Sequence, residues 1–249
     1  MVLVDRAAPL DGAKLAAEYA RRWAPLVARP VAAGAESVTF DLGDGTVTVD
    51  LLSRPADART VDKVAAASWQ WKDAVAAARR HHAHLVVTAK QTGASGTAID
   101  AALRLTRVVA VIAAATKASA IYWTPAAMLL DPARFVAESA AAGRGAFPVQ
   151  LWINVLPAVF TGGQTAVHTL GLAALDMPEL ILAAEGRPDG ALVPSVLRVA
   201  EFAVSRRLVL RDGDKFKLDA QDTLVAALVP APWDAKQTAV RLSFKATRP

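Results

Sequence analysis

Alternating apolar and polar residues between positions 37 and 51 constrain the fold of this chain more tightly than any other feature. The alternation runs through 37–42, stops at Gly43-Asp44-Gly45, and resumes through 46–51. Two such runs around a glycine-rich turn predict a β-hairpin. One face of this hairpin is apolar and the other is polar. We therefore expect an antiparallel sheet that is covered on one side and partly exposed to water on the other.

The predicted elements follow a similar order in the first and second parts of the chain. Up to residue 90 they run strand, helix, strand, strand, helix, strand, which is the order of a split βαβ or ferredoxin-like unit. We therefore predict an α+β protein with two ferredoxin-like halves, mainly antiparallel sheets and helices packed on one face. The halves are 1–96 and 119–249, joined by a helix within 97–118. Whether they share one sheet is left open by the sequence.

The residue ranges of these elements come from hydrophobic periodicity and from turn residues. The helices are predicted at 11–23, 59–80, 97–117, 131–142 and 191–207. The strands are predicted at 1–4, 37–42, 46–51, 84–90, 120–124, 149–156, 164–173, 180–184, 208–210, 215–218 and 238–245.

The composition excludes several classes of function. The 249 residues contain no cysteine, so disulfides, thiol catalysis and zinc–thiolate sites are excluded. The net charge of +5 would suit an acidic partner, but the basic residues are scattered along the chain. No signal peptide is visible, and the apolar run 108–115 is too short to span a membrane. We expect a cytoplasmic protein.

The histidines give one hypothesis for a chemical site. His84 and His168 would approach each other if their strands were neighbours, and Glu179 would then supply a carboxylate for a metal ion. A metal-dependent enzyme or metal-binding protein is therefore one alternative. The other reading makes His168 a buried, hydrogen-bonded structural residue, because Ala166 and Leu170 on the same strand face are apolar.

A polar row on the strand predicted at 149–156 gives a second hypothesis. Gln150, Trp152 and Asn154 share one strand face and would line a ligand groove, with His168 and Thr169 at its edge. The alternative is that a helix covers this face and that Trp152 belongs to the core.

No established catalytic pattern occurs in the sequence. No serine lies in a Gly-x-Ser-x-Gly turn, and no pair of carboxylates is placed for acid–base catalysis. Nucleic-acid binding through an exposed sheet face is a further alternative, but it lacks aromatic residues with basic neighbours on the central strands. We therefore favour a non-catalytic binding or protein-interaction module, without a cofactor or membrane partner, that binds a protein or a small ligand.

Three motifs in the second half resemble a known family. They are Leu151-Trp152-Ile153-Asn154, His168-Thr169-Leu170-Gly171-Leu172 and Pro178-Glu179-Leu180. Trp69-Gln70-Trp71 and His84-Leu85-Val86-Val87 resemble the segment upstream of them. The chain is similar in this way, over about 60–245, to the bacterial domain-of-unknown-function family 4261. The resemblance implies no activity, cofactor or catalytic residue. The fuller family pattern has glycine where Leu175 or Asp176 stands here.

Overall fold

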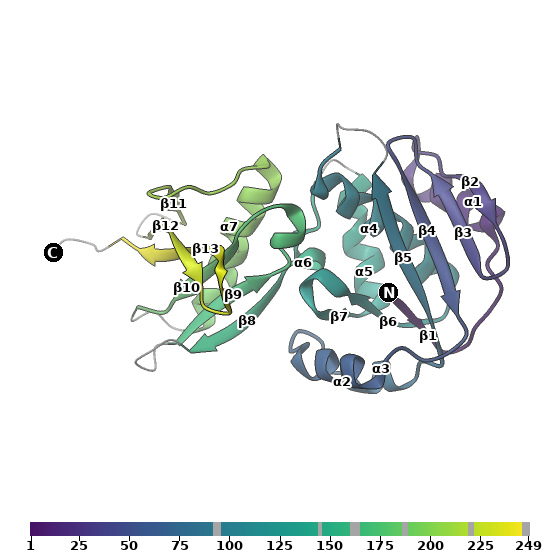
Figure 1. Cartoon of the computed structure of the whole chain (residues 1–249), viewed down its shortest axis with the longest axis horizontal. Helices are drawn as coiled ribbons and strands as arrows, with labels where there is room; N and C mark the ends of the chain where they lie inside the picture. The colour runs from purple at the N-terminus through teal and green to yellow at the C-terminus, as the bar shows by residue number, and fades with distance from the viewer. Residues whose placement is uncertain (92–95, 144–145, 160–164, 186–188, 219–221, 246–249) are drawn as a thin grey trace. The chain divides into compact units, whose positions relative to one another are not determined.

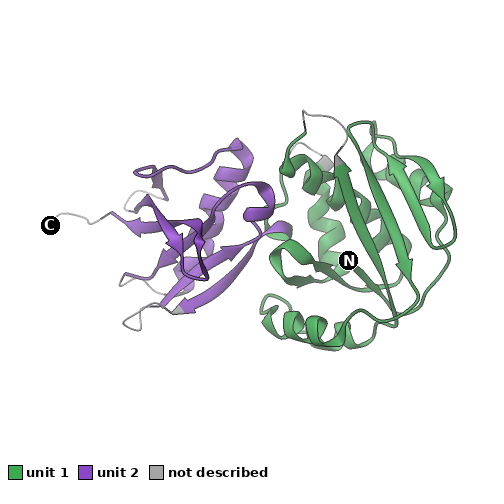
Figure 2. Cartoon of the chain, viewed as in Figure 1, with its two compact units in different colours: residues 1–151 green, residues 152–249 purple. Residues whose placement is uncertain are grey.

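The structure is a computed structural model that describes residues 1–91, 96–143, 146–159, 165–185, 189–218 and 222–245 (Figure 1). The chain divides into two compact units, Met1–Leu151 and Trp152–Pro249, which we name unit 1 and unit 2 (Figure 2). Each unit contains one β-sheet. No helix among the described residues is long and apolar enough to cross a membrane.

Unit 1 is built on a seven-stranded antiparallel sheet. Its strands are β1 (Val2–Val4), β2 (Arg29–Ala33), β3 (Ser37–Asp41), β4 (Gly45–Leu52), β5 (Ala83–Gln91), β6 (Ala118–Trp123) and β7 (Met128–Leu130). Their order across the sheet is β2-β3-β4-β5-β1-β6-β7. The hairpin predicted from alternation is confirmed as β3 and β4, with Val38 paired to Val49. Gly43 turns the chain at φ 88°, a conformation that favours glycine.

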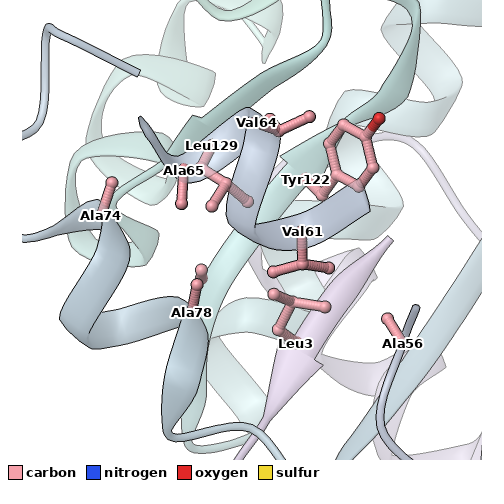
Figure 3. Packing of buried hydrophobic residues seen from close by; sticks show 10 residues of the cluster. Leu3, Ala56, Val61, Val64, Ala65, Ala74, Ala78, Tyr122 and Leu129 are labelled. Carbon is pink, nitrogen blue, oxygen red and sulfur yellow. The ribbon is translucent and has the colours of Figure 1, made fainter. Parts of the chain in front are cut away.

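Helices cover both faces of this sheet, whereas the sequence predicted helices on one face. The helices are α1 (Gly12–Trp23), α2 (Ala58–Ala67), α3 (Ala74–Arg79), α4 (Ala98–Ala115) and α5 (Pro132–Ser139), with short 3-10 turns η1 (Thr124–Ala126) and η2 (Ala140–Gly143). α1 and α4 pack together, and Tyr19 and Val108 from them lie against Phe40 of β3. On the opposite face, α2 and α3 bury a second cluster around Leu3 and Tyr122 (Figure 3).

The helix predicted at 59–80 is divided into α2 and α3. The break follows Ser68, whose hydroxyl donates to the Val64 carbonyl at 2.8 Å and accepts the Leu129 amide at 2.9 Å. These two bonds tie the end of α2 to strand β7. Trp69, just after the break, is 54% exposed. The apolar periodicity continues across the break, because both short helices cover the same cluster.

Unit 2 is built on a six-stranded sheet. Its strands are β8 (Asn154–Val159), β9 (Thr165–Leu170), β10 (Glu179–Ala183), β11 (Lys215–Lys217), β12 (Thr223–Ala231) and β13 (Asp234–Phe244). Their order is β11-β12-β13-β10-β9-β8, and among the described strands of this sheet β10 pairs with β13 in parallel while the other pairings are antiparallel. The helix α7 (Leu192–Arg206) packs on β9 and β10. The short turns are η3 (Ala173–Leu175) and η4 (Asp189–Ala191), and α6 (Val149–Trp152) crosses the division between the units.

Near the carboxyl end, the strand predicted at 215–218 is confirmed as β11, but one predicted strand is wrong and one strand was not predicted. Residues 208–210 form no strand, and β11 pairs with β12, which the sequence did not predict. The segment 223–231 consists almost entirely of apolar residues, so it lacks the alternation by which a strand is recognised.

The mixed α/β class with two mostly antiparallel sheets is confirmed, but ferredoxin-like halves are not. The strand predicted at 120–124 in the second half is β6, and it belongs to the first sheet because it pairs with β1; β7, which the sequence did not predict, pairs with β6 in the same sheet. The division by contacts therefore falls at 151/152 and not within the predicted connecting helix.

Candidate binding site

The first part of the strand predicted at 149–156 is helical, which changes the predicted row of three polar side chains. Residues 149–152 form α6, and β8 begins at Asn154. Gln150 is exposed, whereas Trp152 is 1% exposed. Because successive helical residues point about 100° apart, Gln150, Trp152 and Asn154 do not form one strand face. The prediction of a strand over 149–152 is wrong.

Asn154 and His168 do share a face of the sheet in unit 2. Asn154 pairs with Leu170 and Leu156 pairs with His168, so strand alternation places these residues on one side. The Asn154 side chain is buried, and its Nδ2 atom has no hydrogen-bond partner among the described residues. Two of the predicted ligand-binding residues, Asn154 and His168, therefore share one face of the sheet. Gln150 and Trp152 do not belong to this face.

His168 lies against an exposed tryptophan that the sequence did not point to. The ring centroids of His168 and Trp233 are 5.0 Å apart, with the planes tilted by 31°. Trp233 is 44% exposed, and the Nδ1 atom of His168 is buried with no hydrogen-bond partner in the described part of the chain. Burial lowers the pKa of His168 from its usual 6.5, opposed by the charge of Glu179. Burial therefore favours the neutral form of the imidazole.

Thr169 and Glu179 are brought together, but they bond to each other and to the backbone. The Thr169 hydroxyl donates to Glu179 Oε2 at 2.7 Å and accepts the Leu180 amide at 2.7 Å. Glu179 Oε1 accepts the Gly171 and Ala173 amides at 2.8 and 3.0 Å. Glu179 is 5% exposed, so its carboxylate is a buried acceptor for the turn at 171–173. Both oxygens of the carboxylate are therefore occupied by hydrogen bonds within unit 2.

The predicted metal ligands do not belong to one compact unit. His84 lies in unit 1, where its Nδ1 atom is 2.9 Å from the Arg54 carbonyl, whereas His168 and Glu179 lie in unit 2. Within the described ranges, no group of three histidine, aspartate or glutamate side chains is placed to hold a metal ion.

A pocket in unit 1 is a candidate that the sequence did not reveal. Its volume is about 610 Å³, and it lies between the amino end of α1, the carboxyl end of α4 and the chain leaving β1. Its buried lining is apolar and consists of Val4, Leu15, Leu51 and Leu85. Because these residues come from separate elements, only the tertiary fold brings them together.

The rim of this pocket is charged. Arg6, Lys14 and Lys117 are exposed and line it, and none of them forms an ion pair with a described residue. Two acids also line it, and one of them, Asp11, caps α1 by accepting the Lys14 amide at 2.9 Å. The amino end of a helix favours negative charge. The pocket therefore combines an apolar floor with a mainly cationic rim.

Comparisons of this chain with protein-family models, curated proteins and solved structures gave no match. The resemblance to the family named above stays a prediction.

Proposed function

We propose that the protein is a non-catalytic binding module whose ligand is an amphiphilic anion, with a carboxylate or phosphate head and an apolar body. The observation that carries this proposal is the pocket of unit 1, with its buried apolar floor and its cationic rim. A volume of about 610 Å³ lies in the range of sites for small molecules.

The charges of the rim support an anionic head group. The rim carries three cations, Arg6, Lys14 and Lys117, and two acids. One of these acids, Asp11, already accepts a backbone amide with its carboxylate. The helix dipole of α1 adds partial positive charge at the same end. The net charge of +5 on the whole chain would also draw an anion toward the protein.

The chemistry of the lining supports binding rather than catalysis. The lining contains no histidine, and the Thr116 hydroxyl donates to the Ile112 carbonyl at 2.9 Å. A nucleophile needs a base within hydrogen-bond reach, and no such pair occurs among the lining residues. The apolar floor removes the ligand body from water, while the rim selects its charge.

Decanoate, decanol and acetate test this proposal by calorimetry and thermal unfolding. We expect decanoate to bind and to stabilise the protein, decanol to bind more weakly, and acetate to bind weakest. The double variant Lys14→Gln, Lys117→Gln should weaken decanoate binding about tenfold, since two charge contacts are lost. Lys63→Gln, an exposed lysine of α2, is the matched control. Equal affinity for decanoate and decanol, or equal effects of the double variant and the control, would contradict the proposal.

A second candidate site is the sheet face of unit 2 that carries His168. The contact between His168 and Trp233 supports it, because a partly exposed aromatic pair offers apolar area beside polar nitrogen atoms. A titration with indole or imidazole, followed by NMR at Trp233, tests this candidate. If the site exists, His168→Ala should abolish the chemical-shift change that the ligand causes at Trp233. An unchanged chemical-shift change in this variant would argue against the candidate site.

A further inference from the structure

We propose that unit 1 contains a second, separate site, in which Arg104 and Arg107 of α4 bind a small oxyanion beside Asp44. This site goes beyond the pocket described above, because neither arginine lines that pocket.

Arg104 is a buried cation in the core stripe of α4. It precedes Val108, Val111 and Ile112 by four, seven and eight residues, which places all four on one helix face. Its side chain is 1% exposed, and its Nη1 atom donates to Asp44 Oδ2 at 2.8 Å. Its Nε and Nη2 atoms are buried and have no partner among the described residues. Burying arginine donors without acceptors is costly, so a further acceptor is expected there.

Arg107 adds a second cation one helical turn further along. Its Nη2 atom donates to the Ala142 carbonyl at 2.9 Å, and its buried Nε atom has no described partner. Burial raises the pKa of Tyr19, while the charge of Arg107 and a side-chain hydrogen bond with it act in the opposite direction. Arg107 follows Arg104 by three residues, which places the two arginines at neighbouring positions on the surface of α4. Two cations with one carboxylate leave an excess of one positive charge.

The hairpin turn shapes one side of this region. A Cβ atom on Gly45 would lie 3.0 Å from the Nε and Cζ atoms of Arg104, so the guanidinium lies directly against the turn. Asp44 is 63% exposed, which leaves its carboxylate open to exchange with a solute.

An oxyanion matches the free donors best. Guanidinium N–H groups form a planar fork that binds carboxylate and phosphate oxygens, and such charge-assisted bonds are stronger than bonds to water. A singly charged oxyanion such as dihydrogen phosphate would balance the excess charge and accept from Arg104 and Arg107 together.

Inorganic phosphate is the probe for this site, with the full chain studied by calorimetry and thermal unfolding. Sodium phosphate should stabilise the protein more than sodium chloride of equal ionic strength, and acetate should have a smaller effect. Arg107→Gln should weaken phosphate binding about tenfold or more, the loss expected for one charge-assisted hydrogen bond. Equal effects of phosphate and chloride would mean that water occupies the free donors, and this would overturn the proposal.

Asp44→Asn keeps the proposal testable if Arg107→Gln prevents folding. Removing the competing carboxylate should tighten phosphate binding about tenfold, because the charge excess grows while the shape of the side chain is kept. An unchanged or weaker affinity in this variant would contradict the site. The double variant Lys14→Gln, Lys117→Gln should leave phosphate binding at Arg104 unchanged. That result separates this site from the amphiphile pocket, so either proposal can fail alone.

Discussion

At the residue scale, the most informative contact is the one between Thr169 and Glu179. The sequence marked Thr169 as a residue at the edge of a ligand groove and Glu179 as a carboxylate that could bind a metal ion. In the structure, the Thr169 hydroxyl and two backbone amides supply donors to the buried carboxylate. Such a group is costly to bury unless it is fully hydrogen-bonded. These hydrogen bonds explain the motif by what it contributes to the stability of unit 2, and no catalytic role is needed to account for it.

Thr169→Val should destabilise unit 2 by about 1–3 kcal/mol, because it leaves Glu179 Oε2 and the Leu180 amide without their partner. Chemical denaturation of the variant measures this loss. Thr165→Val is the matched control, since Thr165 is an exposed residue of the same strand. A loss equal to that of the control would show that the buried hydrogen bonds contribute nothing.

The pH dependence of stability should report on His168. Burial lowers its folded-state pKa below 6.5, so the unfolded chain binds the proton more readily. Its contribution to stability is therefore present above pH 6.5 and is lost as the pH falls from that value through the lower folded-state pKa. Thermal unfolding from pH 8 to 5 should show a shallower acid-side decline for His168→Asn than for the unmodified protein. Parallel curves would contradict this, since the other three histidines are common to both proteins.

At the element scale, the β3–β4 turn and α4 depend on each other. The turn is fixed by Gly43 and Gly45, and Arg104 of α4 packs beneath it and bonds to Asp44. α4 itself begins at a capping box formed by Thr97 and Asp100. Thr97 supports the amino end of the same helix that carries both buried arginines.

Gly45→Ala should destabilise unit 1 by about 1–3 kcal/mol, because the added methyl group would lie 2.9 Å from the Lys90 carbonyl and 3.0 Å from Arg104. Gly34→Ala is the control, since its Cβ atom would be at an ordinary 3.6 Å from the Ser37 carbonyl. Urea unfolding compares the two variants. Equal urea midpoints for the two variants would show that the turn accommodates the added methyl group without loss of stability.

At the scale of the whole molecule, each unit has a sheet and a buried cluster of its own. We therefore expect the effects of substitutions to stay within a unit. In hydrogen exchange, Thr169→Val should raise exchange in peptides from 152–249, and Gly45→Ala in peptides from 1–151. Faster exchange throughout the chain in either variant would show that the two units unfold as one.

The sequence predicted most helices and strands but not how they assemble. The β3–β4 hairpin, α1 and β10 follow from local periodicity and turns, and the structure has them close to the predicted places. The helical turn at 149–152 was missed because Val-Gln-Leu-Trp alternates like a strand over four residues. β12 was missed because its apolar run has no period.

The candidate sites were less predictable than the elements. Arg104 carried a signal, since a charged residue on the apolar stripe of a helix marks a buried polar contact, but its partner Asp44 lies sixty residues away. The pocket of unit 1 carried no signal, because Val4, Lys14, Leu51 and Lys117 have no relation in sequence.

The sequence by itself determined the local structures, the absence of cysteine chemistry and the mixed α/β class. These properties depend on neighbouring residues, on turn geometry and on composition, and all three can be obtained directly from the sequence. Only the tertiary structure decided that β6 pairs with β1, that Glu179 bonds to Thr169, and that three cations surround an apolar pocket. Such contacts join distant residues, and they form because the sheets bring together strands that the sequence separates.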